Sequence, residues 1–157
     1  MTPSRRPALS ISVSPLPAAQ RGLEAELALR VPTDVSLIEE AVELVARHLD
    51  AHFVDPRTIR FNLRVALSEA LANAMLYGNG GDITKEVSVR VLFGRTAIEM
   101  EVADEGAGFD PRVVPDPTAP DRLTQPEGRG IFLIQRLVDE VRFNEKGNAI
   151  CMILRRA

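Results

Sequence analysis

The chain has 157 residues, 45% hydrophobic and 26% charged, with a formal net charge of -3 at pH 7. This length suits one domain with a substantial core, and the slightly negative charge gives no support for direct nucleic-acid binding. A single cysteine excludes an internal disulfide and a cysteine-based zinc site. No apolar run reaches the length of a membrane span, so we expect a cytoplasmic protein without a membrane anchor.

Prolines and small polar residues dominate the start of the chain. We expect residues 1–22 to be a disordered tail, because such a composition buries too little apolar surface to offset the entropy of ordering. Residues 23–157 then form a single domain. Its first strand is predicted around Leu27, Leu29 and Val31, which alternate with smaller or charged residues.

Two helices are predicted next. Residues 36–39, Ser-Leu-Ile-Glu, are typical of a capping box, and apolar residues recur at helical spacing as far as Leu49. Asp55-Pro56 supplies an N-cap acceptor and then a proline at the first helical position. This second helix is expected to run to about Tyr77 and to stop at the Gly-Asn-Gly-Gly break of residues 78–81.

The second half of the chain predicts four strands and one helix. Residues 87–93 and 98–102 alternate apolar and polar side chains around a turn at 94–96, which indicates an antiparallel pair with one buried face. A proline-rich segment follows, then a short helix over 131–138 and strands near 141–143 and 150–154. Together the elements predict an α+β fold, a two-layer sandwich with its helices on one face of the sheet.

Asp104-x-Gly106-x-Gly108 directly follows one of these strands. A carboxylate acceptor beside two glycines suits recognition of a base edge with close approach of the backbone to a ligand. The same residue types also make ordinary turns.

Glu69 and Asn73 lie four residues apart, and therefore on one face of the second helix. That face is nearly opposite the stripe of Leu63, Leu67, Leu71 and Ala74. An amide oxygen suits Mg²⁺ beside phosphates, and a nearby carboxylate can accept a proton from an attacking hydroxyl. The alternative is an ordinary polar pair on a helix surface.

Gly128-Arg129-Gly130 stands just before Ile131, where the last helix is expected to open. Backbone N–H groups at a helix N-terminus bind anions, and glycine permits a phosphate to approach closely. Arg129 would add a positive charge there, or would be a solvated side chain. A simple turn is the alternative for the two glycines.

Taken together, the three motifs resemble the nucleotide boxes of the GHKL (Bergerat-fold, histidine-kinase-like) ATPases. Within that superfamily the chain is most similar to the bacterial anti-sigma-factor serine/threonine kinases, through segments such as LSEALANAMLYGN, VADEGAGFD and GRGIFLIQRLVDEV. The resemblance covers roughly residues 25–156. It implies a Bergerat fold with a mixed, mostly antiparallel sheet, ATP and Mg²⁺ as cofactors, and an ATP lid at about residues 110–128.

The resemblance also implies a role for each motif residue. Asn73 would hold Mg²⁺ and Glu69 would be the general base. Asp104 would accept the adenine amino group, with Gly106 and Gly108 shaping the adenine pocket. The phosphates would be bound by Gly128, Arg129 and Gly130.

As for function, the resemblance implies a kinase that phosphorylates an anti-anti-sigma (STAS-type) protein and acts as an anti-sigma factor by holding a sigma factor. Homodimers are common in that family. The alternative is a nucleotide-gated switch with negligible kinase activity. A histidine kinase catalytic domain is disfavoured, because no phospho-acceptor hairpin precedes the domain.

Two departures from the family pattern bear on the catalytic rate. Tyr77 stands where a histidine is frequent, and Asn148-Ala149 stands where a threonine or serine is frequent. The second departure would weaken a polar contact to the nucleotide unless Asn148 supplies it.

Overall fold

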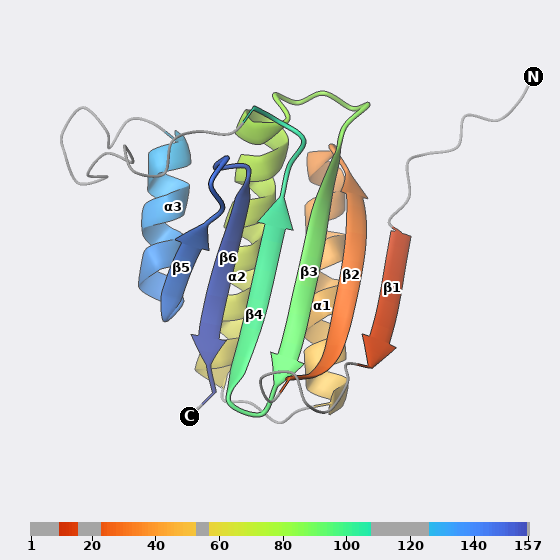
Figure 1. The fold of residues 1–157 in the computed structure, drawn as a ribbon, viewed down its shortest axis with the longest axis vertical. Coiled ribbons are helices and arrows are strands. Elements are labelled where there is room, and N and C mark those ends of the chain that lie inside the picture. The colour runs from red at the N-terminus through yellow and green to blue at the C-terminus, as the bar shows by residue number, and fades with distance from the viewer. Residues whose placement is uncertain (1–9, 16–22, 53–56, 108–125, 157) are drawn as a thin grey trace, which may run out of the picture.

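The protein is a two-layer sandwich of one sheet and three main helices (Figure 1). A computed structural model describes residues 10–15, 23–52, 57–107 and 126–156. The strands are β1 (Ser10–Pro15), β2 (Leu23–Pro32), β3 (Glu86–Gly94), β4 (Ala97–Ala103), β5 (Glu140–Phe143) and β6 (Ala149–Arg155). The helices are α1 (Ile38–His52), α2 (Arg57–Asn73) and α3 (Pro126–Leu137), with the 3-10 turn η1 (Val35–Leu37) and the π-helical turn η2 (Ala74–Gly78). The predicted α+β sandwich is confirmed.

Among the described residues, six strands form the sheet in the order β1-β2-β3-β4-β6-β5. All five described pairings are antiparallel, so the expectation of a mixed sheet was wrong for this part of the chain. The connections explain why. Two helices, α1 and α2, separate β2 from β3 and return the chain to the end it left, so β3 runs back along β2. Between β4 and β5 the described residues form one helix, α3, which would allow a parallel pair, but β6 lies between the two strands.

Strand β1 corrects the predicted boundary of the N-terminal tail. Ser10–Pro15 pairs with β2 over the register Ser10↔Arg30 to Pro15↔Ala25 and forms one edge of the sheet. Ile11 and Val13 alternate with serines, which suits a strand, and Pro15 stands at its end, where proline is tolerated on an edge. The remaining residues of the predicted tail, 1–9 and 16–22, lie outside the described residues.

The core lies between the helices and the inner face of the sheet. Strand residues at alternate positions point inward, since successive side chains face opposite sides of a sheet. These include Leu27, Leu29, Val31, Val87, Val89, Val91, Phe93, Ile98, Met100, Val102, Met152 and Leu154, all buried. Helix α2 presents Leu63, Leu67 and Leu71 to them, each with no exposed surface. Each such side chain contributes about 1.5–3 kcal/mol on burial, and the helix is thereby fixed on the sheet.

Three helix ends differ in detail from the predictions. Asp34 caps the first helical segment, its carboxylate accepting from the Ser36 N–H at 3.0 Å, so Ser36 is not the cap. Helix α3 begins at Pro126, which places residues 126–128 of the predicted lid in its first turn. Helix α2 continues into the π-turn η2, where the Asn79 N–H donates to Ala74 O at 2.8 Å. The N-cap predicted at Asp55 lies outside the described residues.

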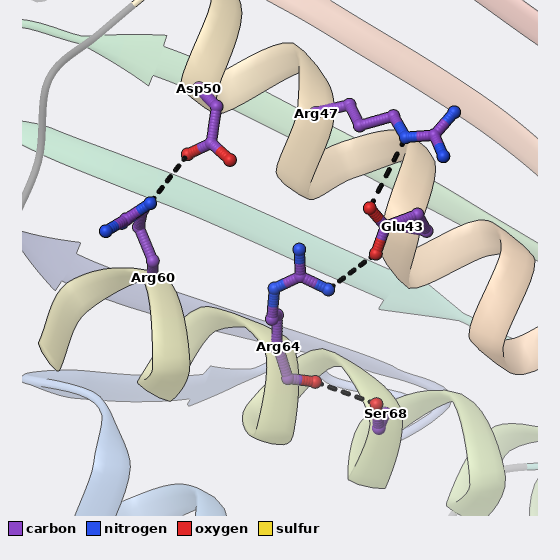
Figure 2. Close-up of polar contacts among 6 residues, drawn as sticks. All are labelled: Glu43, Arg47, Asp50, Arg60, Arg64 and Ser68. Atoms are coloured by element: carbon purple, nitrogen blue, oxygen red, sulfur yellow. Dashed lines mark hydrogen bonds and ion pairs between the residues drawn. The ribbon is translucent and has the colours of Figure 1, made fainter. Parts of the chain in front are cut away.

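Polar contacts join α1 and α2 on their outer surface (Figure 2). The Glu43 carboxylate accepts from Arg64 Nη1 at 2.6 Å and from Arg47 Nε at 3.3 Å. The hydrogen bond from Arg64 is the main reason that the pKa of Glu43 falls below its ordinary value. Arg60 lies 3.9 Å from Asp50 in a second, looser pair. These partly exposed pairs orient the two helices more than they stabilise them.

Within the part of the chain that the structure describes, every helix is too short or too polar to span a membrane.

Candidate active site

The predicted site residues that the structure describes lie at one end of the sandwich. There α2 and η2 end, β4 ends, and α3 begins, at the upper end of the view in Figure 1. Asn73 and Gly78 stand five positions apart in the sequence, a separation of about 7 Å along a helix. Because Asn73 contacts the start of α3 and Gly78 contacts the residues after β4, the end of α2 links two clusters of side chains.

The first cluster contains Glu69, Asn73 and Gly130. A Cβ at Gly130 would lie 2.8 Å from Asn73 Nδ2, 3.1 Å from Asn73 Oδ1 and 3.2 Å from Glu69 Oε2. The backbone of α3 therefore approaches both side chains at a distance that only glycine permits without a shift. Gly130 is buried, and Glu69 and Asn73 are half-buried. A carboxylate oxygen and an amide thus converge on the second turn of α3.

Helix α3 adds backbone donors beside this cluster. The first amides of an α-helix have no partner within the helix, and Pro126 has no N–H, so the first turn of α3 offers the amides of residues 127 and 128 to an anion. Gly128 and Arg129 therefore lie in the first turn, where a phosphate binds most readily. Only the backbone of these two residues is described, so the predicted contribution of the Arg129 side chain lies outside the described residues, as does Gly108.

The second cluster is a narrow slot around Asp104. A Cβ at Gly78 would lie 2.8 Å from Asp104 Oδ1 and closer still to its Cγ and Oδ2. On the other side, the Gly106 N–H donates to Asp104 Oδ1 at 2.7 Å, and a Cβ at Gly106 would collide with the Gly78 carbonyl. The two glycines therefore allow the carboxylate to fit between two backbone segments. Gly78 was predicted only as a helix break, and its packing against Asp104 was missed.

Burial is the main cause that raises the pKa of Asp104 above its ordinary value. The hydrogen bond from the Gly106 N–H opposes this, as do the charges of Lys146 and Lys85, in that order. Desolvation disfavours the ionised form of a carboxyl, whereas hydrogen bonds and positive charges favour it. Asp104 is thus a partly desolvated acceptor, and a donor from a ligand would relieve the cost of its burial.

Asn148, just before β6, contacts the same end of β4. Its Nδ2 donates to Asp104 O at 3.0 Å, and its backbone oxygen accepts from the Asp104 N–H at 2.9 Å. The residue at the departure from the family pattern therefore holds the backbone of Asp104. Tyr77, at the other departure, lies in η2 with 45% of its surface exposed.

Asn79, which was also predicted only as part of the break, is the other residue that sequence reasoning missed. Its Oδ1 accepts from the Glu105 N–H at 2.8 Å. Its signal in the sequence is only that an amide follows Gly78 directly, at the end of a helix.

Comparison with known proteins identifies the family of this domain. Residues 31–154 match the histidine kinase-like ATPase domain. Over 89 residues the chain is 37% identical to the serine-protein kinase RsbW of Bacillus licheniformis, a match that covers 52% of this chain and 54% of that protein. It is 34% identical to the serine-protein kinase RsbW of Bacillus subtilis over 99 residues, 58% of this chain and 61% of the relative.

The serine-protein kinase RsbW of Oceanobacillus iheyensis is 30% identical over 98 residues, 59% of this chain and 62% of the relative. The chain thus spans 54–62% of the length of these three relatives. The match to the ATPase domain is longer and includes every element from the end of β2 to β6. The resemblance to the histidine-kinase-like ATPases is confirmed, and the chain belongs to the histidine kinase-like ATPase domain family.

Proposed function

We propose that this protein is an ATP-dependent serine/threonine protein kinase. The observation that supports this most is the convergence of Glu69 and Asn73 on Gly130, beside the free amides at the start of α3. A carboxylate that can accept a proton, an amide oxygen that can bind a metal ion, and backbone amides that can bind an anion then lie close together. Phosphoryl transfer needs mainly positioning and neutralisation of charge, which such a region can provide.

The residues present suit Mg-ATP. An amide oxygen is a hard ligand of the kind that Mg²⁺ accepts beside phosphate oxygens, so Asn73 would hold the ion. The space that a Cβ at Gly130 would fill lies directly against Asn73. At the other end, the slot that holds Asp104 suits the amino group of adenine, which donates hydrogen bonds that a carboxylate accepts.

Each residue then has one task. Asp104 accepts the adenine amino group, and Gly78 and Gly106 hold its carboxylate in place. The amides of the first turn of α3 bind the phosphates, and Gly128 and Gly130 allow close approach. Mg-ATP supplies the phosphoryl group that is transferred. Glu69 would take the proton from the attacking hydroxyl as its oxygen bonds the γ-phosphorus, while the bond from that phosphorus to the β–γ bridging oxygen breaks and ADP leaves.

The family resemblance and the relatives, which are named serine-protein kinases, support a protein as the substrate. We propose that the acceptor is a serine or threonine of a STAS-type anti-anti-sigma protein, and that the kinase also acts as an anti-sigma factor by binding a sigma factor. We also propose that the protein is a cytoplasmic homodimer that does not bind nucleic acid directly.

The test is transfer of label from [γ-³²P]ATP in the presence of Mg²⁺ to the STAS-type proteins of the same genome. We expect label on a serine or threonine of one of them with the wild type. Asn73→Ala should abolish labelling, because the metal loses its protein ligand. Failure to label any candidate in spite of tight ATP binding would contradict the kinase and favour the nucleotide-gated switch.

A further inference from the structure

Asn79 is one of the two polar residues that are buried within the described part of the chain. It is 3% exposed, and the other, Thr33, is 4% exposed. A buried amide is costly unless its donors and acceptor find partners. Asn79 follows Gly78, the residue that packs against the Asp104 carboxylate. The hydrogen bonds of the Asn79 side chain therefore help to set the position of Gly78 relative to that carboxylate.

The Asn79 amide bonds three separate segments. Its Nδ2 donates to Thr33 Oγ1 at 2.9 Å, just after β2, and to Glu86 O at 3.1 Å, at the start of β3. Its Oδ1 accepts from the Glu105 N–H at 2.8 Å, in the loop after β4. Both donors and one acceptor position of the amide are thus used. A backbone bond from Asn79 N to Ala74 O at 2.8 Å fixes the residue to η2.

Glu105 stands between Asp104 and Gly106, the two residues of the slot that follow β4. The loop is held from the other side as well, because Glu105 Oε2 accepts from the Glu86 N–H at 2.6 Å. Asn148 holds the backbone of Asp104. The bond from Asn79 connects this loop to the end of the helix, where Gly78 packs against the other side of the Asp104 carboxylate.

We infer that Asn79 is a positioning residue for the Asp104 carboxylate. By bonding the Glu105 N–H while its own backbone continues from Gly78, it sets the spacing between the carboxylate and the glycine wall. This inference rests on the proposed function, in which Asp104 reads the amino group of adenine. Asn79 does not contact the nucleotide. It holds the Asp104 carboxylate where that group can accept a hydrogen bond from the adenine amino group.

The test compares the affinity for ATP with that for purine riboside triphosphate, which lacks the 6-amino group. The ratio of the two affinities reports the Asp104 contact and is independent of general loss of stability. We expect wild type to prefer ATP by about tenfold or more, the effect of a hydrogen bond to a charged group. Asn79→Ala should reduce this preference to about twofold or less.

Thr33→Val is the matched control, because it breaks the same buried network while the bond from Asn79 to Glu105 remains. It should lower the melting temperature as Asn79→Ala does, yet keep the wild-type preference for ATP. If Asn79→Ala does not fold, Asn79→Ser takes its place, since a shorter hydroxyl fills part of the space but does not reach Glu105 as the amide does.

The outcomes separate the inference from the proposed function. Loss of the preference in the Asn79 variant but not in Thr33→Val supports the inference. An unchanged preference in the Asn79 variant, or equal loss in both variants, overturns the inference and leaves the role of Asp104 intact. A wild type that binds the two nucleotides equally, or binds neither, overturns the proposed role of Asp104 and the inference with it.

Discussion

The two ends of the candidate site are built in different ways. Around Asp104, the backbone of Gly78 and of Gly106 packs against the carboxylate. Hydrogen bonds from Asn148 and Asn79 hold the backbone of residues 104 and 105. Around Glu69 and Asn73 the site consists of two side chains on α2 and the backbone of α3 packed against them. Under the proposed function the two ends have separate tasks: the Asp104 end would recognise adenine, and the Glu69 end would carry out the transfer.

The largest effect should come from Glu69→Gln. This change keeps the shape of the side chain but removes its ability to accept a proton, so transfer should fall by about 10²–10⁴-fold. The affinity for Mg-ATP should remain within about threefold of wild type, because a general base contributes little to ground-state binding. Transfer assays and calorimetric titration on the same preparation measure the two quantities. Equal transfer by the variant and wild type would remove Glu69 from this role.

Gly78→Ala should weaken the binding of ATP at the Asp104 end of the site. The added methyl group would overlap the Asp104 carboxylate and force it out of the slot. Loss of a hydrogen bond to a charged group corresponds to about tenfold or more in ATP affinity. Gly80→Ala is a useful contrast, because a Cβ there would meet nothing within 4 Å, although the positive φ of 60° adds local strain. If Gly78→Ala binds ATP as wild type does, the slot is not the adenine site.

Asp104→Asn should change how the free energy of unfolding depends on pH. Burial raises the pKa of Asp104 in the folded protein above the ordinary 3.8. A raised carboxyl pKa gives stability that is complete below the unfolded-state pKa and is lost as the pH rises through the folded-state pKa. The free energy of unfolding of the nucleotide-free variant should therefore rise relative to wild type as the pH increases from about 3.8 to 7. Urea denaturation across this range measures the difference; a difference that does not change with pH would show that burial of the charge has no cost.

Arg64→Ala should have the smallest effect. Its guanidinium bonds Glu43 across α1 and α2, away from both clusters, and both side chains are more than a third exposed (Figure 2). Such pairs contribute little to stability in water, so the affinity for ATP should change by less than about twofold with only a slight fall in melting temperature. A large fall in ATP affinity would mean that the outer surface of the helices is coupled to the site.

Periodicity was enough to predict most of the fold. Alternation at Leu27, Leu29 and Val31 and the helical stripe from Leu63 to Ala74 reflect burial on one face, which is a local property of the sequence. β1 was missed because four prolines in the first 22 residues outweighed the short alternation at Ile11 and Val13. Its partner, β2, stabilises it through pairing that local composition does not encode.

The site was predicted in part for a similar reason. Glu69 and Asn73 are close in sequence and share a helix face, so their proximity could be foreseen. The contacts of Gly78 with Asp104 and of Asn79 with Thr33 and Glu105 join residues that are 26 to 46 positions apart. They depend on the position of the end of η2 relative to the end of β4 in the folded protein. A sequence pattern does not predict that position.

The most direct test of the division between the two ends is calorimetric titration of Mg-ATP into wild type, Glu69→Gln and Asp104→Asn. We expect Glu69→Gln to bind Mg-ATP within about threefold of wild type, and Asp104→Asn to bind it about tenfold more weakly or worse. If Glu69→Gln lost as much affinity as Asp104→Asn, or if Asp104→Asn bound ATP like wild type, the two ends would not have the separate tasks assigned to them.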